Sequence, residues 1–270
     1  DHVRLDYLYA LSGQRESLMD WYPFRADGVL LEAGAGYGAL TGVYSRKVSR
    51  VHVLDPDEDN LELNRLRHVE LGGRTNISYE TGELCSYAAS CDEKYDYVVF
   101  AGTLGDHAKE EIRAARKLLK PGGEILAAVC NPFGIKYWAG AEKDPCSFSL
   151  RQLLDLMSER EGDVEIYYPM PDYRLPVTIF SDRYLPGKGV LTDKVTAYDY
   201  PDYLAMDVGA RFDQVCEDGR FPQYANSYLA VWKKEGEAGE DNNIEYVKYN
   251  RTRKERFQIR TVITGPARQV

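Results

Sequence analysis

The sequence predicts an α/β fold built on a mostly parallel β-sheet, and three observations lead to this prediction. Apolar runs that read as strands alternate with helical stretches between residues 28 and 131. Strands that alternate with helices form a parallel sheet with helices on both of its faces. The first apolar run leads directly into a glycine-rich turn, "EAGAGYG" (32–38), at the edge where such sheets bind their ligands.

Five strands and three helices are expected in this region. The strands are predicted over residues 28–34, 51–56, 76–82, 95–102 and 124–131, and the helices over residues 38–50, 57–73 and 108–120. Acidic residues in the first turn and Gly72-Gly73 after the last turn delimit the second helix. Pro121-Gly122-Gly123 is expected to end the third helix.

The chain is expected to add further elements to both ends of this core. Residues 3–24 read as one or two helices, with Leu5, Leu8, Leu11, Leu18 and Trp21 as core candidates. Later elements are a helix over 149–160, a strand over 163–169 and a return strand over 226–232. The range 132–225 is longer than the connection needs and is dense in tyrosine, aspartate and proline. We therefore expect an inserted aromatic-rich subdomain before the last strand.

The first domain is expected to span residues 1–232. A charged stretch without a hydrophobic face, "KKEGEAGEDNN" (233–243), reads as a linker. Residues 244–270 then form either a β-hairpin or the start of a further domain of the same polypeptide. The first residue is not Met, which we interpret as a sign of a fragment or a processed chain.

The composition limits the function classes that the chain can belong to. Hydrophobic residues make up 44% of the 270 residues, yet no stretch approaches the ~20 apolar residues that a membrane-spanning helix needs. The net charge of −9 argues against a nucleic-acid partner. The five cysteines are odd in number and lack CxxC spacing. We therefore expect reduced thiols in a cytoplasmic protein, with no metal site.

The glycine turn admits two interpretations by spacing alone. Gly34, Gly36 and Ala39 fit the dinucleotide pattern, in which a pyrophosphate sits on a helix N-terminus. Gly34, Gly36 and Gly38 also fit a pattern in which an acid, here Glu32, lies two residues before the first glycine. That acid would repel a pyrophosphate but can accept charge-assisted hydrogen bonds from the ammonium of an amino-acid moiety.

Asp55 favours a nucleoside ligand. It ends the second predicted strand, where a carboxylate can accept hydrogen bonds from both ribose hydroxyls. Glu83, after the third strand, is a candidate for contact with the base, and Leu84 can flank the ring. Further cofactor-site candidates at the same edge of the sheet are Ala33, Pro56, Gly102 and Thr103.

With these residues in place, the chain resembles the class I S-adenosylmethionine-dependent methyltransferases. The resemblance covers residues 28–131 and lies in "LLEAGAGYG", "VLDPDE", "TGEL", "YDYVVFAGTL" and "RKLLKPGGEILAAV". It implies a Rossmann-like sheet of seven strands whose last strand is antiparallel, and S-adenosylmethionine as the cofactor. It also implies that Glu32, Gly34, Gly36 and Gly38 hold the methionine part, Asp55 the ribose and Glu83 the adenine amine.

A narrower resemblance concerns the methyl acceptor. The stretches "NPFGIKYWAGAEKDP" and "YYPMPDYRLPVTIFSDRYLPG" resemble methyltransferase domains attached to bacterial cell-surface polysaccharide and glycosyltransferase proteins. This implies a glycan or glycan-precursor acceptor and O-methylation, with a small metabolite as a further possibility. The acceptor-site candidates are Asn131, Tyr137, Trp138, Tyr168, Asp172 and Tyr173.

His107 is the candidate general base for a hydroxyl acceptor, because it follows the fourth strand at the functional edge. The alternative is that His107 is a helix-capping residue that faces the solvent. Two other functions stay open at this stage. One is a non-catalytic scaffold module of a polysaccharide-assembly protein, and the other is an NAD-dependent oxidoreductase, which Glu32 and "KPGG" disfavour.

Overall fold

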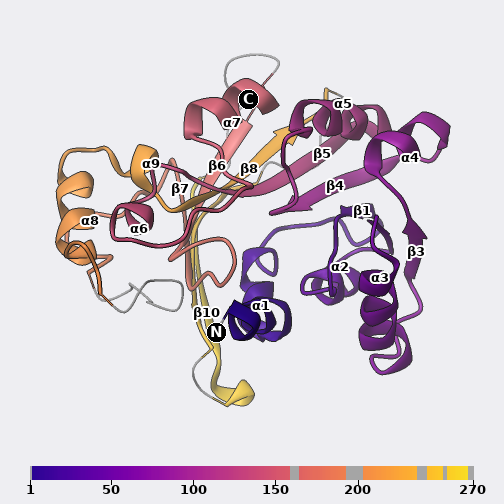
Figure 1. Ribbon diagram of the computed structural model, residues 1–270, viewed down its shortest axis with the longest axis horizontal. Coiled ribbons are helices and arrows are strands. Elements are labelled where there is room, and N and C mark those ends of the chain that lie inside the picture. The colour runs from indigo at the N-terminus through magenta and orange to yellow at the C-terminus, as the bar shows by residue number, and fades with distance from the viewer. Residues whose placement is uncertain (1, 159–163, 193–202, 236–241, 252–253, 267–270) are drawn as a thin grey trace.

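A single ten-stranded sheet organises the chain, with helices on both faces (Figure 1). The computed structural model describes residues 2–158, 164–192, 203–235, 242–251 and 254–266. The strands are β1 (Val29–Ala33), β2 (Arg50–Asp55), β3 (Ile77–Thr81), β4 (Tyr95–Ala101), β5 (Leu119–Cys130), β6 (Val164–Met170), β7 (Thr178–Ser181), β8 (Ser227–Lys233), β9 (Ile244–Asn250) and β10 (Ile259–Thr264). Their spatial order is β10-β9-β7-β6-β8-β5-β4-β1-β2-β3.

The sheet has a parallel half and an antiparallel half. Strands β3, β2, β1, β4 and β5 pair in parallel, as the alternation of strands and helices predicts. Every pairing from β5 outward, through β8, β6, β7 and β9 to β10, is antiparallel. The structure therefore has the predicted Rossmann-like α/β fold with a parallel core, but its sheet contains ten strands rather than seven. Strands β7, β9 and β10 lie beyond the other seven and extend the antiparallel edge.

The helices that belong to the described residues are mostly short. They are α1 (His2–Leu11), a 3-10 helix (Gly13–Leu18), α2 (Thr41–Lys47), α3 (Glu58–Arg65), a π-helical turn (Leu66–Glu70), α4 (Leu84–Ser90), α5 (Ala108–Leu118), α6 (Ile135–Trp138), α7 (Leu150–Met157), α8 (Val208–Glu217), α9 (Phe221–Tyr224) and a 3-10 turn (Glu255–Phe257). None of the helices in this part of the chain is long and apolar enough to cross a membrane.

Capping explains where two of the predicted helices begin. Asp57 accepts a hydrogen bond from the backbone N–H of Asp59 at 2.9 Å and so starts α3. Ser149 and Gln152 form a capping box at the start of α7. The expected stop at Pro121-Gly122-Gly123 is displaced, because β5 already begins at Leu119. A register shift against β4 accommodates these residues inside the strand.

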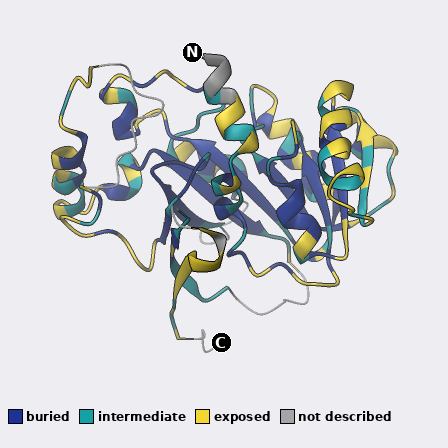
Figure 2. Ribbon diagram, turned by 90° about the horizontal axis from the view of Figure 1, so that it is seen from below, coloured by how far each residue is buried: buried dark blue, intermediate teal, exposed yellow. Residues whose placement is uncertain are grey.

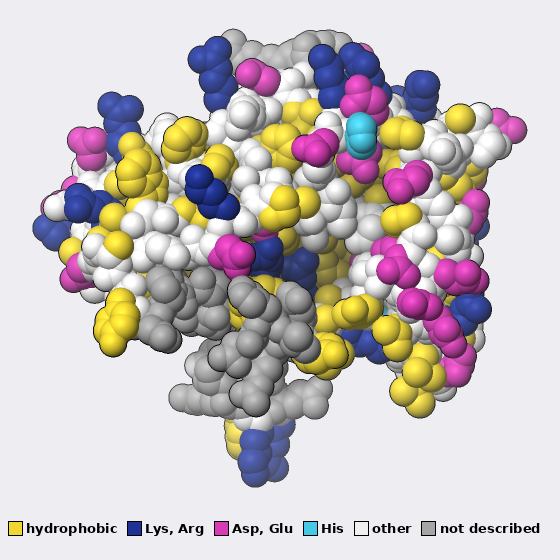
Figure 3. Space-filling view, viewed as in Figure 1, with side chains coloured by type: hydrophobic (Ala, Val, Ile, Leu, Met, Phe, Trp, Pro, Cys, Tyr) yellow, Lys and Arg dark blue, Asp and Glu magenta, His cyan; other side chains and the backbone are white. Residues whose placement is uncertain are grey.

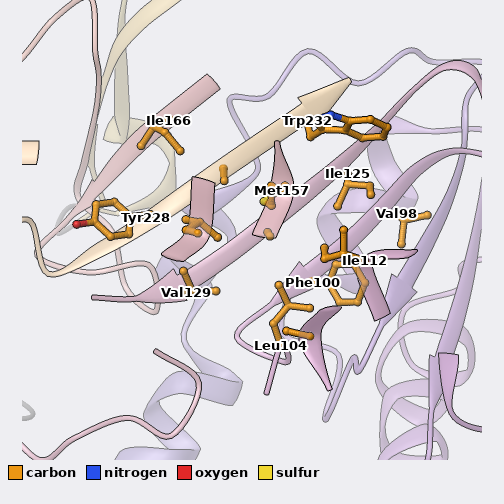
Figure 4. Close-up of a cluster of buried hydrophobic side chains, with 14 of the residues drawn as sticks. Val98, Phe100, Leu104, Ile112, Ile125, Val129, Met157, Ile166, Tyr228 and Trp232 are labelled. Atoms are coloured by element: carbon orange, nitrogen blue, oxygen red, sulfur yellow. The ribbon is translucent and has the colours of Figure 1, made fainter. Parts of the chain in front are cut away.

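Two apolar layers hold the helices to the sheet. Along β4, Val98 and Phe100 face one layer, whereas Tyr97 and Val99 face the other, because strand side chains alternate between faces. The first layer includes α4, α5 and α7, and Figure 4 shows some of its side chains. The second includes α2, α3 and residues 18–24. Burial is concentrated in the sheet between these layers, as Figure 2 shows.

The N-terminal helix differs from its prediction. Leu18 and Trp21 are buried in the core as expected, but Leu8 and Leu11 are exposed by 41% and 63%, and Leu5 is half-buried. Among the side chains of α1 whose burial is described, none belongs to the two buried apolar clusters. Instead, Arg67 donates a hydrogen bond to the Ala10 carbonyl at 2.7 Å.

The range 132–225 does not form a subdomain of its own among the described residues. Its strands β6 and β7 belong to the common sheet. Its helices α7 and α8 contribute Met157 and Phe212 to the same apolar layer as β4. The aromatic residues of this range therefore serve largely as core. Strand β9 pairs with β7, so the C-terminal hairpin also continues this sheet.

Candidate active site

The glycine turn between β1 and α2 requires glycine at two positions for steric reasons. Gly34 and Gly38 have φ values of 75° and 73°, which side-chain-bearing residues rarely adopt. A Cβ on Gly34 would lie 2.6 Å from Cγ2 of Thr103, and one on Gly38 would lie 2.6 Å from Asn64. Gly36 also has a positive φ, of 50°, but a Cβ there would meet no atom within 4 Å. The turn therefore presents open space at its middle glycine.

Asp55 is held rigidly at the end of β2. Its Oδ2 accepts a hydrogen bond from the Gly36 N–H at 2.8 Å, which ties the strand to the glycine turn. Its Oδ1 accepts from the Asp57 N–H at 3.0 Å and from the Asn60 side chain at 3.1 Å. A carboxylate oxygen can accept more than one hydrogen bond. Asp55 can therefore still bind a pair of ligand hydroxyls from a fixed position.

Glu32 lies behind the turn, 4% exposed, in a chain of polar side chains. Thr41 donates to its Oε2 at 2.6 Å, and Asn64 donates to the Thr41 hydroxyl at 2.9 Å. Burial raises the pKa of Glu32 to about 8, against the opposing effects of the Thr41 hydrogen bond and the Arg15 charge. A buried carboxyl group with a raised pKa is a candidate for binding a ligand cation.

A cavity of about 370 Å³ opens at the carboxyl ends of β1, β2 and β4. It is lined by Ala33, Gly34, Gly36, Leu54, Asp55, Pro56, Asn60, Gly82, Glu83, Leu84, Phe100, Thr103 and Glu111. Eight of these are predicted cofactor-site residues: Ala33, Gly34, Gly36, Asp55, Pro56, Glu83, Leu84 and Thr103. Among the described residues no group of three or more His, Cys, Asp or Glu side chains could hold a metal ion.

Three predicted cofactor-site residues do not line this cavity. Glu32 sits behind it in the Thr41 network, and Gly38 packs against Asn64. Gly102 has a φ of 86°, and a Cβ there would collide with the hydroxyl of Tyr173. Gly102 therefore allows a close approach of Tyr173 to the end of β4.

Sequence reasoning missed several lining residues. Leu54 and Phe100 read as ordinary core positions of their strands. Asn60 was not predicted as a site residue, because the acidic first turn of its helix indicated only a helix start. In the structure its side-chain amide donates a hydrogen bond to Asp55. Glu111, on α5, has its pKa raised by burial and then by the charge of Glu83. The sequence pattern that could have indicated Glu111 is an acidic residue three positions before Ala114, which is buried.

Arg15 is a buried cation near the site that was not predicted from the sequence. Its side chain comes from the 3-10 helix, is 8% exposed, and donates to the carbonyls of Ala101 at 3.1 Å and Tyr173 at 3.0 Å. Within the described part of the chain no carboxylate lies within 4.0 Å of its guanidinium, although Glu32 is close enough for the Arg15 charge to lower its pKa. The site thus combines a buried cation and a buried acid near the ends of β1 and β4.

His107 and Glu83 both stand at helix N-termini on this edge. His107 is exposed and precedes α5, and its side chain makes no capping hydrogen bond. The Glu83 side chain likewise makes no capping bond at α4 and borders the cavity. The Glu83 side chain is therefore available to a ligand in this cavity, whereas His107 is exposed and is not among the residues that line it.

The structure brings some of the expected acceptor residues to accessible positions and buries others. Asn131 is fully buried, and its amide donates to the carbonyls of Gln223 and Ala225. Tyr168 is a core residue that donates to Asp182. Asp172 forms a buried ion pair with Lys136 at 2.9 Å. An acceptor cannot contact these three without disrupting the core, which corrects the expectation for them.

Tyr137 and Trp138 are accessible to a ligand, whereas Tyr173 is buried. Tyr137 is half-buried on α6, with the Lys136 ammonium 5.1 Å from its ring centre. Trp138 is 58% exposed and lines a second cavity of about 740 Å³ between α6, α8 and α9. Tyr173 is 3% exposed and lies between Arg15 and the end of β4. Figure 3 shows basic side chains deep in a hollow near the middle of one face, away from the acidic surface around α3.

Comparison with known proteins agrees with this geometry. Residues 30–123 match the family model described as "Methyltransferase domain". This range contains β1 except for Val29, all of β2 to β4, the glycine turn, and every residue that lines the smaller cavity.

Curated relatives match over a similar part of the chain. The ubiquinone biosynthesis O-methyltransferase of Erwinia tasmaniensis is 30% identical over 120 residues, which are 42% of this chain and 48% of that protein. The corresponding protein of Escherichia fergusonii is 31% identical over 112 residues, which are 40% of this chain and 45% of that protein. The matched segment thus spans about half the length of these relatives.

Solved structures share the fold at low identity. Phosphoethanolamine N-methyltransferase 1 of Haemonchus contortus, in complex with phosphoethanolamine and S-adenosylhomocysteine, has a TM-score of 0.50 and 16% identity, covering 88% of this chain and 45% of that one. A putative methyltransferase from Bacillus halodurans has a TM-score of 0.50 and 18% identity, covering 83% of this chain and all of the other. Residues 30–123 therefore resemble a methyltransferase domain, and the chain has the fold that these methyltransferase structures share.

Proposed function

We propose that the protein transfers the methyl group of S-adenosylmethionine to an oxygen atom of a glycan, a glycan precursor or a small metabolite. The observation that carries the proposal is the fixed carboxylate of Asp55 in a cavity beside an open glycine turn. A carboxylate at the end of the second strand can accept hydrogen bonds from both ribose hydroxyls of a nucleoside.

The methionine end of the cofactor is proposed to bind between two buried groups of opposite charge. Glu32 would accept the ammonium group, because an ion pair would compensate for the cost of burying its carboxylate. The Arg15 guanidinium would receive the carboxylate, since its hydrogen bonds to the described residues go to the neutral carbonyls of Ala101 and Tyr173. At the other end, Glu83 is proposed to accept from the adenine amine, with Leu84 against the ring.

The chemistry needs little covalent participation from the chain. S-adenosylmethionine supplies an electrophilic methyl group on a sulfonium ion. The residues around the end of β4 would hold the acceptor oxygen in line with that methyl group and exclude water. His107 is proposed to take the hydroxyl proton.

The acceptor assignment rests on the aromatic residues beyond β5. Trp138 offers an exposed indole face in a cavity that also contains Arg211, Gln214 and Gln223, which can hydrogen-bond hydroxyl groups. Tyr137 is proposed to contact the acceptor nearer to the methyl group. The proposal retains an association with polysaccharide synthesis on the strength of the sequence resemblance. The five cysteines form no disulfide, which supports a cytoplasmic location.

A methyl-transfer assay tests this proposal. The protein is incubated with S-adenosylmethionine and panels of nucleotide sugars, free sugars, phenols and amines, and S-adenosylhomocysteine release is measured. Turnover with a hydroxyl acceptor supports the proposal, whereas turnover only with amines contradicts O-methylation. His107→Ala should lower kcat by roughly 100-fold or more while cofactor affinity stays constant. An unchanged kcat would remove His107 from the mechanism.

A further inference from the structure

The C-terminal hairpin of β9 and β10 packs against the N-terminal segment. Val247 and Tyr249 of β9 are 0% and 5% exposed and share an apolar cluster with Trp21 and Tyr22. Figure 1 shows the hairpin (yellow) beside the N-terminal part of the chain (indigo). The guanidinium of Arg251 donates to the Gly13 carbonyl at 2.9 Å, where the 3-10 helix begins. The hairpin therefore packs against the segment that carries Arg15.

Asp20 is the acidic residue whose carboxylate the side chains of the hairpin contact. Its Oδ2 accepts from the Tyr249 hydroxyl at 3.3 Å and from Arg260 at 3.2 Å. Arg260 also donates to the backbone carbonyl of Asp20 at 3.2 Å, and Arg251 lies 3.7 Å from the carboxylate. Tyr249 of β9, Arg260 of β10 and Arg251, which follows β9, thus contact this one residue.

Asp20 is coupled to Arg15 through a single turn of chain. The N–H of Asp20 donates to the Glu16 carbonyl at 2.8 Å, and the Arg15 N–H donates to the Ser12 carbonyl at 3.1 Å. Leu18, between them, is fully buried and packs in the apolar cluster that also contains Trp21. A displacement of Asp20 would therefore shift the backbone that carries the Arg15 guanidinium.

We propose that the hairpin positions Arg15 for the carboxylate end of the cofactor, with Asp20 as the positioning residue. This inference rests on the proposed function. A guanidinium that is already fixed loses less conformational freedom when it binds an anion, so preorganisation appears as affinity. Because the Asp20 side chain is 29% exposed, the effect is modest and weakens with added salt.

The test compares two ligands by calorimetry on the full chain. S-adenosylhomocysteine has the amino-acid carboxylate, whereas 5′-methylthioadenosine shares the adenosine part and lacks it. Asp20→Ala should weaken S-adenosylhomocysteine binding about three- to fivefold and leave 5′-methylthioadenosine within about twofold of wild type. Arg260→Gln should weaken the same ligand in the same direction, and it serves as the milder variant if Asp20→Ala does not fold.

The matched control is Glu93→Ala. Glu93 pairs with Arg50, and the side-chain exposures of 29% and 46% are nearly those of Asp20 and Arg260, at 29% and 47%. This variant should leave both affinities unchanged. In an Arg15→Gln background, Asp20→Ala should have no further effect on S-adenosylhomocysteine, because its influence passes through Arg15.

Several results would overturn the inference. Equal losses for both ligands would indicate general loosening of the fold, and additive effects of the Asp20 and Arg15 substitutions would indicate independent roles. If Arg15→Gln weakens S-adenosylhomocysteine binding and Asp20→Ala does not, the positioning role fails while the proposed function stands. If the wild-type chain does not bind S-adenosylhomocysteine, the proposed function itself fails.

Discussion

The raised pKa of Glu32 predicts that cofactor affinity depends on pH in the neutral range. An ammonium group binds the ionised carboxylate, and burial raises the pKa of this carboxyl to about 8 in the unliganded protein. At pH 7 only about one tenth of the molecules carry the ionised form. The apparent affinity is then about tenfold below its limit at high pH. Between pH 8 and pH 6 the same relation predicts a fall of about 50-fold.

Calorimetry measures this linkage directly. S-adenosylhomocysteine is titrated at pH 6, 7 and 8, each in two buffers with different ionisation enthalpies. At pH 7 binding should release about 0.9 proton, because the bound ammonium keeps Glu32 ionised. The ligand 5′-methylthioadenosine lacks the ammonium group, so its affinity should be nearly constant. A flat profile for S-adenosylhomocysteine without proton release would refute the assignment of Glu32 to the ammonium.

The same pKa shift affects the stability of the unliganded protein. A carboxyl whose pKa is higher in the folded than in the unfolded state stabilises the fold below the unfolded value of about 4.5. That contribution is lost as the pH rises towards 8. We therefore expect Glu32→Gln to have a higher Tm than wild type at pH 9 and a similar Tm at pH 4. A lower Tm at pH 9 would contradict a raised pKa.

Two further predictions concern residues around the end of β4. Gly102→Ala should lower the free energy of unfolding by about 1–3 kcal/mol, because of its positive φ and the Tyr173 hydroxyl, whereas Gly105→Ala, in open space, should change it by less than about 0.5 kcal/mol. Lys136→Met should lower the free energy of unfolding by about 3–5 kcal/mol, because it leaves the Asp172 carboxylate buried without the Lys136 ammonium. The double variant Lys136→Met with Asp172→Leu should lower it by less. Denaturant unfolding measures both, and equal costs within either pair would contradict the packing described.

The parallel half of the fold was predictable because its signals are local. Each strand is a short apolar run and each helix has end signals such as Asp57 or Gly72-Gly73. Residues that follow strand ends meet at one edge of a parallel sheet. This rule predicted that Gly36, Asp55, Glu83 and Thr103 lie at one edge, and in the structure all four line one cavity.

The antiparallel half depends on contacts that sequence patterns do not encode. Tyr168 and Tyr173 were predicted as acceptor-site residues, yet long-range packing buries both. Arg15 lies 86 residues from Ala101, whose carbonyl it contacts, and no local pattern distinguishes it from a surface arginine. The pairing of β9 with β7 likewise joins segments separated by an intervening helix pair and strand.

The most direct test of the central claim is the affinity of the intact chain for S-adenosylhomocysteine, compared with Asp55→Ala and with NAD. We predict micromolar binding to wild type, a loss of at least about tenfold in Asp55→Ala, and no binding of NAD. A folded wild-type protein that does not bind S-adenosylhomocysteine, or that binds it equally well without the Asp55 carboxylate, would contradict the account.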